Sequence, residues 1–169
     1  MSFRPDLVGC WVFRTTEDGA IEILMLHRAP GRIYPGVWQC VTGGLEADER
    51  VVDAALRELS EETGITSADI EAFYGLDQVN TFYAEHTDRI EAEAVFAAHV
   101  RRSVQVRISH EHDDQRWVSP AEARELVVWP AYRTAIEHVE WLVAHPRHAP
   151  FLLAGRWAVE GSFPPAESR

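Results

Sequence analysis

The stretch that decides the fold is Gly43–Ile65, which reads GGLEADERVVDAALRELSEETGI. Its glycine pair follows a short extended run at 37–42 and lets the backbone turn sharply and approach a ligand closely. From Asp48 onward, apolar residues recur at three- and four-residue spacing, the pattern of one face of an α-helix. Gly64 stands where a left-handed residue commonly ends a helix. The stretch therefore predicts a strand, a tight turn and a helix that ends at Gly64.

Acidic side chains are concentrated in this stretch. Three of them, Glu58, Glu61 and Glu62, are three and four residues apart, so a helix places them on one face, where like charges repel. A face of this kind is commonly only solvated. Behind a glycine turn it also offers the hard oxygen ligands that suit Mg²⁺ or Mn²⁺, ions that usually bind carboxylates together with substrate phosphates. The residues by themselves leave both interpretations open.

The whole chain is acidic, with 27 Asp and Glu against 16 Lys and Arg in 169 residues and a formal net charge of −11. This balance argues against a nucleic acid duplex or an anionic membrane surface as a partner, because both are bound through basic side chains. The sequence shows no signal-peptide pattern and no run of about 20 apolar residues. Cys10 and Cys40 form no CxxC pair. We therefore expect one cytoplasmic domain with reduced, buried thiols.

The spacing within Gly43–Ile65 resembles the Nudix box, the signature of the Nudix hydrolase family. Every fixed position of that motif is filled, namely by Gly43, Glu49, Arg57, Glu58, Leu59, Glu61, Glu62, Gly64 and Ile65. The resemblance implies the α/β class, with an α/β/α sandwich, a mixed β-sheet and a single domain over residues 1–145. It does not fix the order of the C-terminal extension at 146–169.

The resemblance also implies the roles of the box residues. Glu58, Glu61 and Glu62 would coordinate the cation, Mg²⁺ or Mn²⁺, and Arg57 would hold these carboxylates in place. Glu49 would be an internal brace or an outer metal contact. Gly43 and Gly44 would shape the loop that meets the substrate, whereas the side chains of Leu59 and Ile65 would belong to the core.

Outside the box, Glu111 is the acid that we expect to act, as a further metal ligand or as the general base that deprotonates water. The alternative for Glu111 is an exposed loop acid. The neighbouring His110 and His112 are expected to be solvated. The predicted catalytic residues are therefore Glu58, Glu111 and Arg57, and the predicted metal ligands are Glu58, Glu61, Glu62 and Glu111.

Substrate contacts are expected from the segments that flank the box. Arg28, beside a Pro/Gly-rich loop at 29–36, is a candidate phosphate contact, and Arg32 is a weaker one. Trp38, Phe82 and Tyr83 are candidates to stack on a ring of the substrate, although core packing is the commoner fate of aromatic residues in strands. The predicted substrate-binding set is Arg28, Gly43, Gly44 and Trp38.

The rest of the chain predicts further strands and helices. Apolar patterns indicate strands at 7–13, 21–27, 70–84, 90–100 and 104–108, and a polar loop at 109–114. Ser119-Pro120 with Glu122 indicates a capped helix to about residue 127, and a second helix is expected from 131 to about 144.

Three flanking segments resemble the branch of the family that contains dihydroneopterin triphosphate and dATP pyrophosphatases. They are Trp38–Gly44, Glu111-His112 with Trp117, and residues 129–137. The resemblance thus implies metal-dependent hydrolysis of a diphosphate linkage in a nucleoside or pterin triphosphate. The alternatives are a dinucleoside polyphosphate, ADP-ribose or nucleotide sugar as substrate, or a non-catalytic nucleotide-binding sensor. A homodimer is left open.

Overall fold

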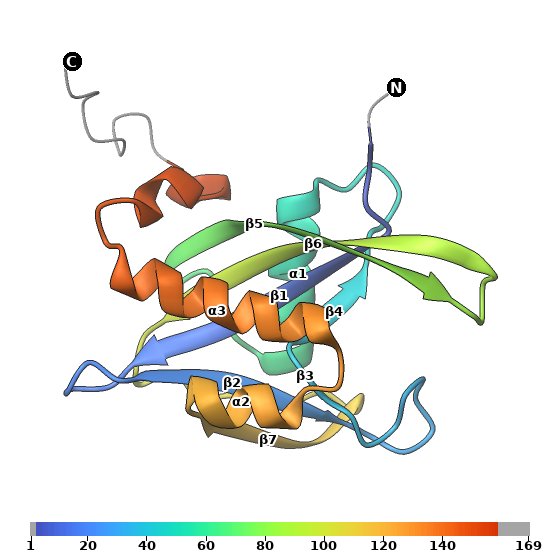
Figure 1. Cartoon of the computed structure of the whole chain (residues 1–169), viewed down its shortest axis with the longest axis horizontal. Helices are drawn as coiled ribbons and strands as arrows, with labels where there is room; N and C mark the ends of the chain where they lie inside the picture. Colours follow the sequence, from blue (N-terminus) through green and yellow to red (C-terminus); the bar gives the residue numbers. More distant parts are fainter. Residues whose placement is uncertain (1–2, 159–169) are drawn as a thin grey trace.

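A computed structural model describes residues 3–158 of the chain (Figure 1). Its strands are β1 (Leu7–Thr15), β2 (Ile21–Arg28), β3 (Trp38–Gln39), β4 (Val41–Gly44), β5 (Ile70–Ala84), β6 (Arg89–Val100) and β7 (His112–Val118). Its α-helices are α1 (Val51–Thr63), α2 (Pro120–Leu126) and α3 (Pro130–Ala144), followed by the 3₁₀ turns η1 (Ala149–Leu152) and η2 (Gly155–Trp157). The strands expected at 7–13, 21–27, 70–84 and 90–100 and the three α-helices are confirmed.

The strands form one mixed sheet, as predicted. Its order is β3-β2-β1-β6-β5, with β4 also paired to β1 and β7 to β2. The strands β1 and β6 run parallel, and the other pairs run antiparallel. Because β1 bonds to β4 through its first half, to β2 through its second half and to β6 along its other edge, it is the centre of the sheet.

The side chains of β1 alternate between two cores, as a pleated strand buried on both faces requires. Val8, Cys10 and Val12 pack in one core with residues of α1, including Leu59. Trp11 and Phe13 pack in the other core, which α2 and α3 cover. The predicted α/β/α sandwich is therefore confirmed, with α1 behind the sheet in Figure 1 and α2 and α3 in front. Leu59 and Ile65 are buried, as expected.

The helix ends follow the predicted signals. Gly64 adopts the left-handed conformation at φ 71° and its amide donates to the carbonyl of Ser60, which ends α1. Ser119 and Glu122 form a complete capping box at the start of α2.

None of the helices in residues 3–158 is long and apolar enough to cross a membrane. Cys10 and Cys40 are free and buried, as predicted.

The predicted strand at 104–108 is wrong. Val104 is buried against the α1 core, but the amides of Arg107 and Ser109 donate to the carbonyls of Thr63 and Glu62 at the end of α1, at 2.8 and 3.0 Å. The segment therefore follows the helix end and not the sheet. The predicted polar loop is also too long, because β7 already begins at His112.

The C-terminal extension is packed on the domain as far as Trp157. The amide of Ala154 donates to the carbonyl of Phe73 at 2.8 Å, and Leu153 forms an isolated bridge with Tyr74. The Trp157 ring lies 5.6 Å from that of Phe73. Residues 159–169, the remainder of the predicted extension, lie outside the described residues.

Candidate active site

Arg57 organises the acidic face of α1. Its Nε and Nη2 atoms donate to the two carboxylate oxygens of Glu49 at 2.9 and 3.0 Å, and Nη1 donates to Glu58 at 2.7 Å and to Glu61 at 3.3 Å. Nη2 also donates to the carbonyl of Gly44 at 3.0 Å. One guanidinium thus ties the helix to the turn before it, the arrangement that the resemblance implies for Arg57 and Glu49.

Gly43 is a glycine because Glu58 occupies the space of a side chain. A Cβ atom at position 43 would stand 1.9 Å from the carboxyl carbon of Glu58, whereas a Cβ at Gly44 would meet nothing within 4 Å. The turn therefore presses the Glu58 carboxylate against the backbone of β4.

Three carboxylates repel one another at this end of α1. Burial, and then the charges of Glu58 and Glu111, raise the pKa of Glu62 to about 8, although the Thr42 amide donates to it at 3.4 Å. Burial also raises the pKa of Glu58, against the effect of Arg57. Glu111 faces the same cluster from the loop before β7, and Arg32 lies 3.8 Å from its carboxylate. The structure therefore brings the predicted Glu58, Glu62 and Glu111 together.

The donor set fits a divalent cation that takes part of its ligands from elsewhere. Within residues 3–158, no group of three or more His, Cys, Asp or Glu side chains is arranged so that it could hold a metal ion, and the exposed Glu61 carboxylate bonds to Arg57. Mg²⁺ usually binds one or two carboxylates together with water and substrate phosphates. A divalent cation would relieve the repulsion among these carboxylates, and their hard oxygen atoms suit Mg²⁺ or Mn²⁺.

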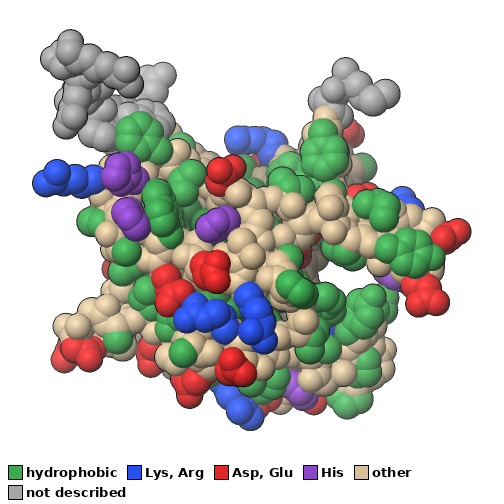
Figure 2. Space-filling view, in the orientation of Figure 1, with side chains coloured by type: hydrophobic (Ala, Val, Ile, Leu, Met, Phe, Trp, Pro, Cys, Tyr) green, Lys and Arg blue, Asp and Glu red, His purple; other side chains and the backbone are tan. Residues whose placement is uncertain are grey.

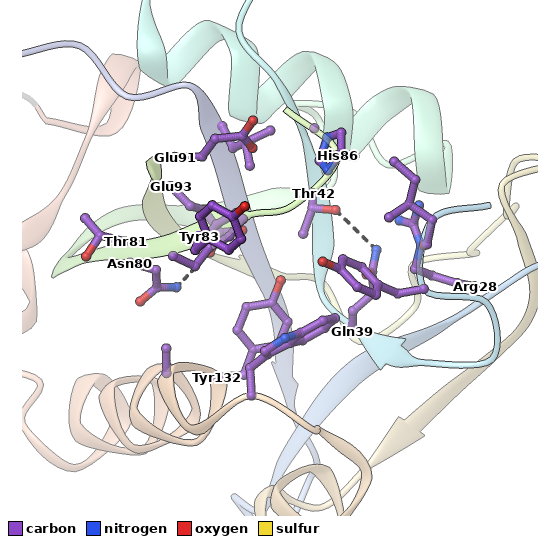
Figure 3. Close-up of a pocket in the computed structure, with 17 residues that line it drawn as sticks. Arg28, Gln39, Thr42, Asn80, Thr81, Tyr83, His86, Glu91, Glu93 and Tyr132 are labelled. Atoms are coloured by element: carbon purple, nitrogen blue, oxygen red, sulfur yellow. Dashed lines mark hydrogen bonds between the residues drawn. The ribbon is translucent and has the colours of Figure 1, made fainter. Parts of the chain in front are cut away.

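A cavity of about 330 Å³ is lined by Thr42 and Gly43, the backbone neighbours of the Glu62 and Glu58 carboxylates, although no carboxylate of the cluster lines it. Figure 2 shows it as the hollow between the projecting β5–β6 hairpin and the body of the molecule. Its lining residues are Leu7, Arg28, Ile33, Tyr34, Gln39, Thr42, Gly43, Asn80, Thr81, Phe82, Tyr83, His86, Glu91, Glu93, Trp129, Ala131 and Tyr132 (Figure 3). Arg28 and Gly43 thus line the cavity as the prediction of substrate contacts requires, and Arg28 is held by a 2.7 Å bond to the carbonyl of Ile33.

The aromatic prediction fits the cavity only in part. Phe82 and Tyr83 line it, but Trp38 does not: its ring packs against the α2–α3 core, with the Arg116 guanidinium 4.6 Å from its centre. Trp129 and Tyr132, at the start of α3, stand in the cavity wall, and sequence reasoning assigned them no role. The sequence signal that could have indicated them is an aromatic pair at the start of a predicted helix, with Trp129 just before Pro130 and Tyr132 two residues after it.

The two loop histidines differ. His110 is exposed, as expected, but His112 is only 4% exposed, and the prediction that it is solvated is wrong. Neither ring nitrogen of His112 has a hydrogen-bond partner among the described residues, and burial followed by the charge of Arg28 lowers its pKa to about 4. His112 opens β7 opposite Arg28, at the point where the register of the two strands shifts, and is therefore a strand residue and not a loop residue.

Comparisons with known proteins agree with this geometry. The sequence model of the NUDIX domain matches residues 4–142. A solved NUDIX hydrolase structure from Listeria monocytogenes is similar, with a TM-score of 0.72, 28% identity, and coverage of 85% of this chain and 97% of that one. The dihydroneopterin triphosphate pyrophosphohydrolase of E. coli has a TM-score of 0.63, 26% identity, and coverage of 77% and 92%.

Curated relatives extend beyond the matched region. The chain is 32% identical over 136 residues to the chloroplastic Nudix hydrolase 21 of Arabidopsis thaliana, covering 78% of this chain and 64% of that protein. It is 34% identical over 118 residues to an octanoyltransferase of Myxococcus xanthus, covering 69% of this chain but 31% of that protein. The chain thus spans less than two thirds of the length of either relative. With a matched domain over most of its length, the chain belongs to the NUDIX family.

Proposed function

We propose that this protein hydrolyses a diphosphate linkage in a nucleoside or pterin triphosphate with the help of Mg²⁺ or Mn²⁺. The observation that carries the proposal is the electrostatic cluster of Glu58, Glu62 and Glu111, with Arg28 close enough to act on Glu62 and also lining the cavity. A cation at this cluster and the Arg28 guanidinium would together offset the charge of a bound phosphate chain. The similarity to the E. coli dihydroneopterin triphosphate pyrophosphohydrolase supports this class of substrate.

Glu58, Glu61 and Glu62 would hold the cation, which supplies charge neutralisation of the phosphate oxygens and a water of lowered pKa. Arg57 holds Glu58 and Glu61 in place through its ion pairs, and the carboxylate oxygens that it leaves unpaired would be available to the cation. Glu111, which is not part of α1, is free to accept the proton of the attacking water. The water oxygen bonds to phosphorus, the bridging P–O bond breaks, and the leaving phosphate departs with its electron pair.

A substrate panel tests the proposal directly. We would incubate the protein with nucleoside and pterin triphosphates, dinucleoside polyphosphates, ADP-ribose and nucleotide sugars in Mg²⁺ or Mn²⁺ and identify products by chromatography. Fastest turnover of a triphosphate is expected. Fastest turnover of a dinucleoside polyphosphate or ADP-ribose would replace the substrate class, and nucleotide binding without turnover would favour the sensor module.

The carboxylate cluster is tested by Glu62→Gln and Glu58→Gln. Either change keeps the shape but removes a ligand charge, so kcat should fall by about 100-fold or more while the circular dichroism spectrum is retained. Glu46→Gln is the matched control, because Glu46 is an exposed acid of the same motif outside the cluster. Activity like that of the unchanged protein in Glu62→Gln would remove the cluster from the mechanism.

A further inference from the structure

Two buried acids line the cavity, Glu91 and Glu93, and both belong to β6 and not to α1. Glu93, on β6, is 4% exposed and lines the cavity floor (Figure 3). No part of the hydrolytic step proposed above uses it. A buried carboxylate is costly unless it is hydrogen-bonded or has a partner of opposite charge, so the groups that stabilise Glu93, and the acceptor positions that they leave unused, show what it could bind.

The sheet makes room for this carboxylate. Gly9 on β1 has no side chain, and a Cβ atom there would stand 2.8 Å from Oε1 of Glu93. Glu93 therefore extends over β1 toward Thr42, which is paired with Gly9 on β4. Since adjacent strands are about 4.8 Å apart, a carboxylate over Gly9 of β1 lies about one strand spacing from β4, and Thr42, Gly43 and Glu93 line the same cavity.

Glu93 is oriented by donors from its neighbours. Nδ2 of Asn80, on the paired strand β5, donates to Oε2 of Glu93 at 2.7 Å, and Nε2 of Gln78 in turn donates to Oδ1 of Asn80 at 2.7 Å. Burial raises the pKa of Glu93, and hydrogen bonds from Asn80 and Tyr132 oppose that effect. A carboxylate offers about four acceptor positions, so two donors leave two acceptor positions for a ligand.

The surrounding wall suits a flat ring. Trp129, Tyr132 and Tyr34 form a chain of edge-on ring contacts with centroid separations of 5.2 and 5.5 Å, and all three line the cavity. Aromatic walls of this kind hold planar rings by stacking. With Arg28 near the phosphates and Glu93 at the other side, a nucleotide would place the edge of its base against Glu93.

From this geometry we infer that Glu93 selects bases that present two adjacent N–H donors, the 2-amino-4-oxopyrimidine edge shared by guanine and pterin. The ring N–H and the exocyclic amino group of that edge can both donate to one carboxylate. Adenine would instead direct a ring nitrogen lone pair at the carboxylate and leave an acceptor unpaired, which a buried polar site rejects. The inference deepens the proposed function, on which it rests for the identity of the ligand as a phosphorylated base.

The test is binding of the α,β-methylene analogues of GTP, ITP and ATP with Mg²⁺, measured by titration calorimetry. We expect the guanosine analogue to bind about 100-fold more tightly than the adenosine analogue, with the inosine analogue between them because it lacks the amino group. In Glu93→Gln, the amide offers one donor and one acceptor, so the guanosine-to-adenosine ratio should fall toward 1. Equal binding of the three analogues, or an unchanged ratio in Glu93→Gln, would overturn the inference.

The matched control is Glu91→Gln, the same change two residues away on β6 and in the same cavity. The Glu91 oxygen Oε1 is already engaged by Thr87 at 2.9 Å and by Arg89 at 3.5 Å, so the ratio should not change. If Glu93→Gln fails to fold, as circular dichroism would show, the three-analogue series on the unchanged protein decides the question.

Hydrolysis assays distinguish the proposed role of Glu93 in base selection from the proposed hydrolysis of triphosphates. If the analogue ranking holds but no triphosphate is hydrolysed, the proposed function fails and the role of Glu93 stands. If triphosphates are hydrolysed but the three analogues bind equally, the proposed function stands and the role of Glu93 fails. The kcat/KM values for GTP and dihydroneopterin triphosphate then show which source of the shared edge is preferred. Glu93→Gln should raise KM for both substrates with little change in kcat, the split expected of a group that binds the base.

Discussion

Gly43 and Gly44 are neighbours in the chain, yet only Gly43 has a carboxylate packed against its Cα atom. The requirement at position 43 is one of space, since its φ is not among the positive values. An added methyl group there must displace the Glu58 carboxylate, which Arg57 holds from the other side.

Gly43→Ala should therefore lower kcat/KM by about 100-fold and reduce the free energy of unfolding by about 1–3 kcal/mol, the range typical of an overpacked site. Gly44→Ala is the control, because a Cβ at that position meets open space, and its activity should stay within about threefold of the unchanged protein. The measurements are steady-state kinetics and urea unfolding. Equal effects of the two changes would show that the Glu58 contact does not matter.

Glu111 differs from the glutamates of α1 because it comes from a loop. Its carboxylate is 38% exposed and reaches the cluster without being braced by Arg57. If it is the general base, Glu111→Gln should lower kcat by about 100-fold, within the usual contribution of general base catalysis, and change the affinity for Mn²⁺ by less than about threefold. Kinetics and Mn²⁺ titration by electron paramagnetic resonance check this. A large loss of Mn²⁺ affinity would make Glu111 a ligand, and unchanged kcat would remove it from the site.

Among the elements, those with strong local signals were predictable. The helix α1 has a periodic apolar face and a glycine end, and α2 has its capping box. The segment 104–108 alternates like a strand, but its neighbour Thr63 offers an unpaired helix-end carbonyl that its backbone satisfies. Whether such a segment bonds to a neighbouring strand or to a helix end depends on tertiary contacts, which the local sequence pattern does not contain.

In the candidate site, too, the residues that one helix brings together were predictable, and those that only the strand pairing brings together were not. Glu58, Glu61 and Glu62 belong to one helix, so spacing alone placed them together. Glu93 and Asn80 meet only because β5 pairs with β6 in a register that shifts between Gly75 and Val79, and a shift of one residue would turn Asn80 to the other face. No sequence pattern fixes such a shift, and these cavity residues were therefore missed.

The packed C-terminal segment leads to a prediction for an element. Trp157 contacts Phe73 and belongs to the α1 core, and Gly155 beside it approaches Val52 of α1. Trp157→Ala should lower the free energy of unfolding by about 1–3 kcal/mol, less than for a fully buried aromatic residue. Val128→Ala is the control, since Val128 is 60% exposed. Urea unfolding measures both, and equal, small losses would mean that the segment does not contribute to stability.

For the whole molecule, His99 couples stability to pH. Burial lowers its pKa, with Glu71 partly opposing, while its ring stacks on Phe13 at 4.8 Å. The unfolded chain, in which a histidine titrates near 6.5, therefore binds more protons than the folded one in the window between the two pKa values. The contribution of His99 to the free energy of unfolding should thus be fully present above about pH 6.5 and fall as the pH is lowered toward the folded pKa.

His99→Phe keeps a ring on Phe13 and removes the titration, so its loss of stability between pH 6.5 and pH 5 should be smaller than that of the unchanged protein. The same substitution at the exposed His145 should leave the loss as it was. Urea unfolding at the two pH values measures the difference. A parallel fall in the unchanged protein and in His99→Phe would show that other groups carry the pH dependence.

The central position of β1 has a consequence for how the chain is made. On a ribosome, residues 7–15 emerge well before their parallel partner β6, which ends only at Val100. Until then one edge of a strongly apolar strand is without its neighbour, and parallel pairing across so long a loop is intrinsically slow. During this interval of synthesis the nascent chain is most exposed to aggregation and has most need of a chaperone.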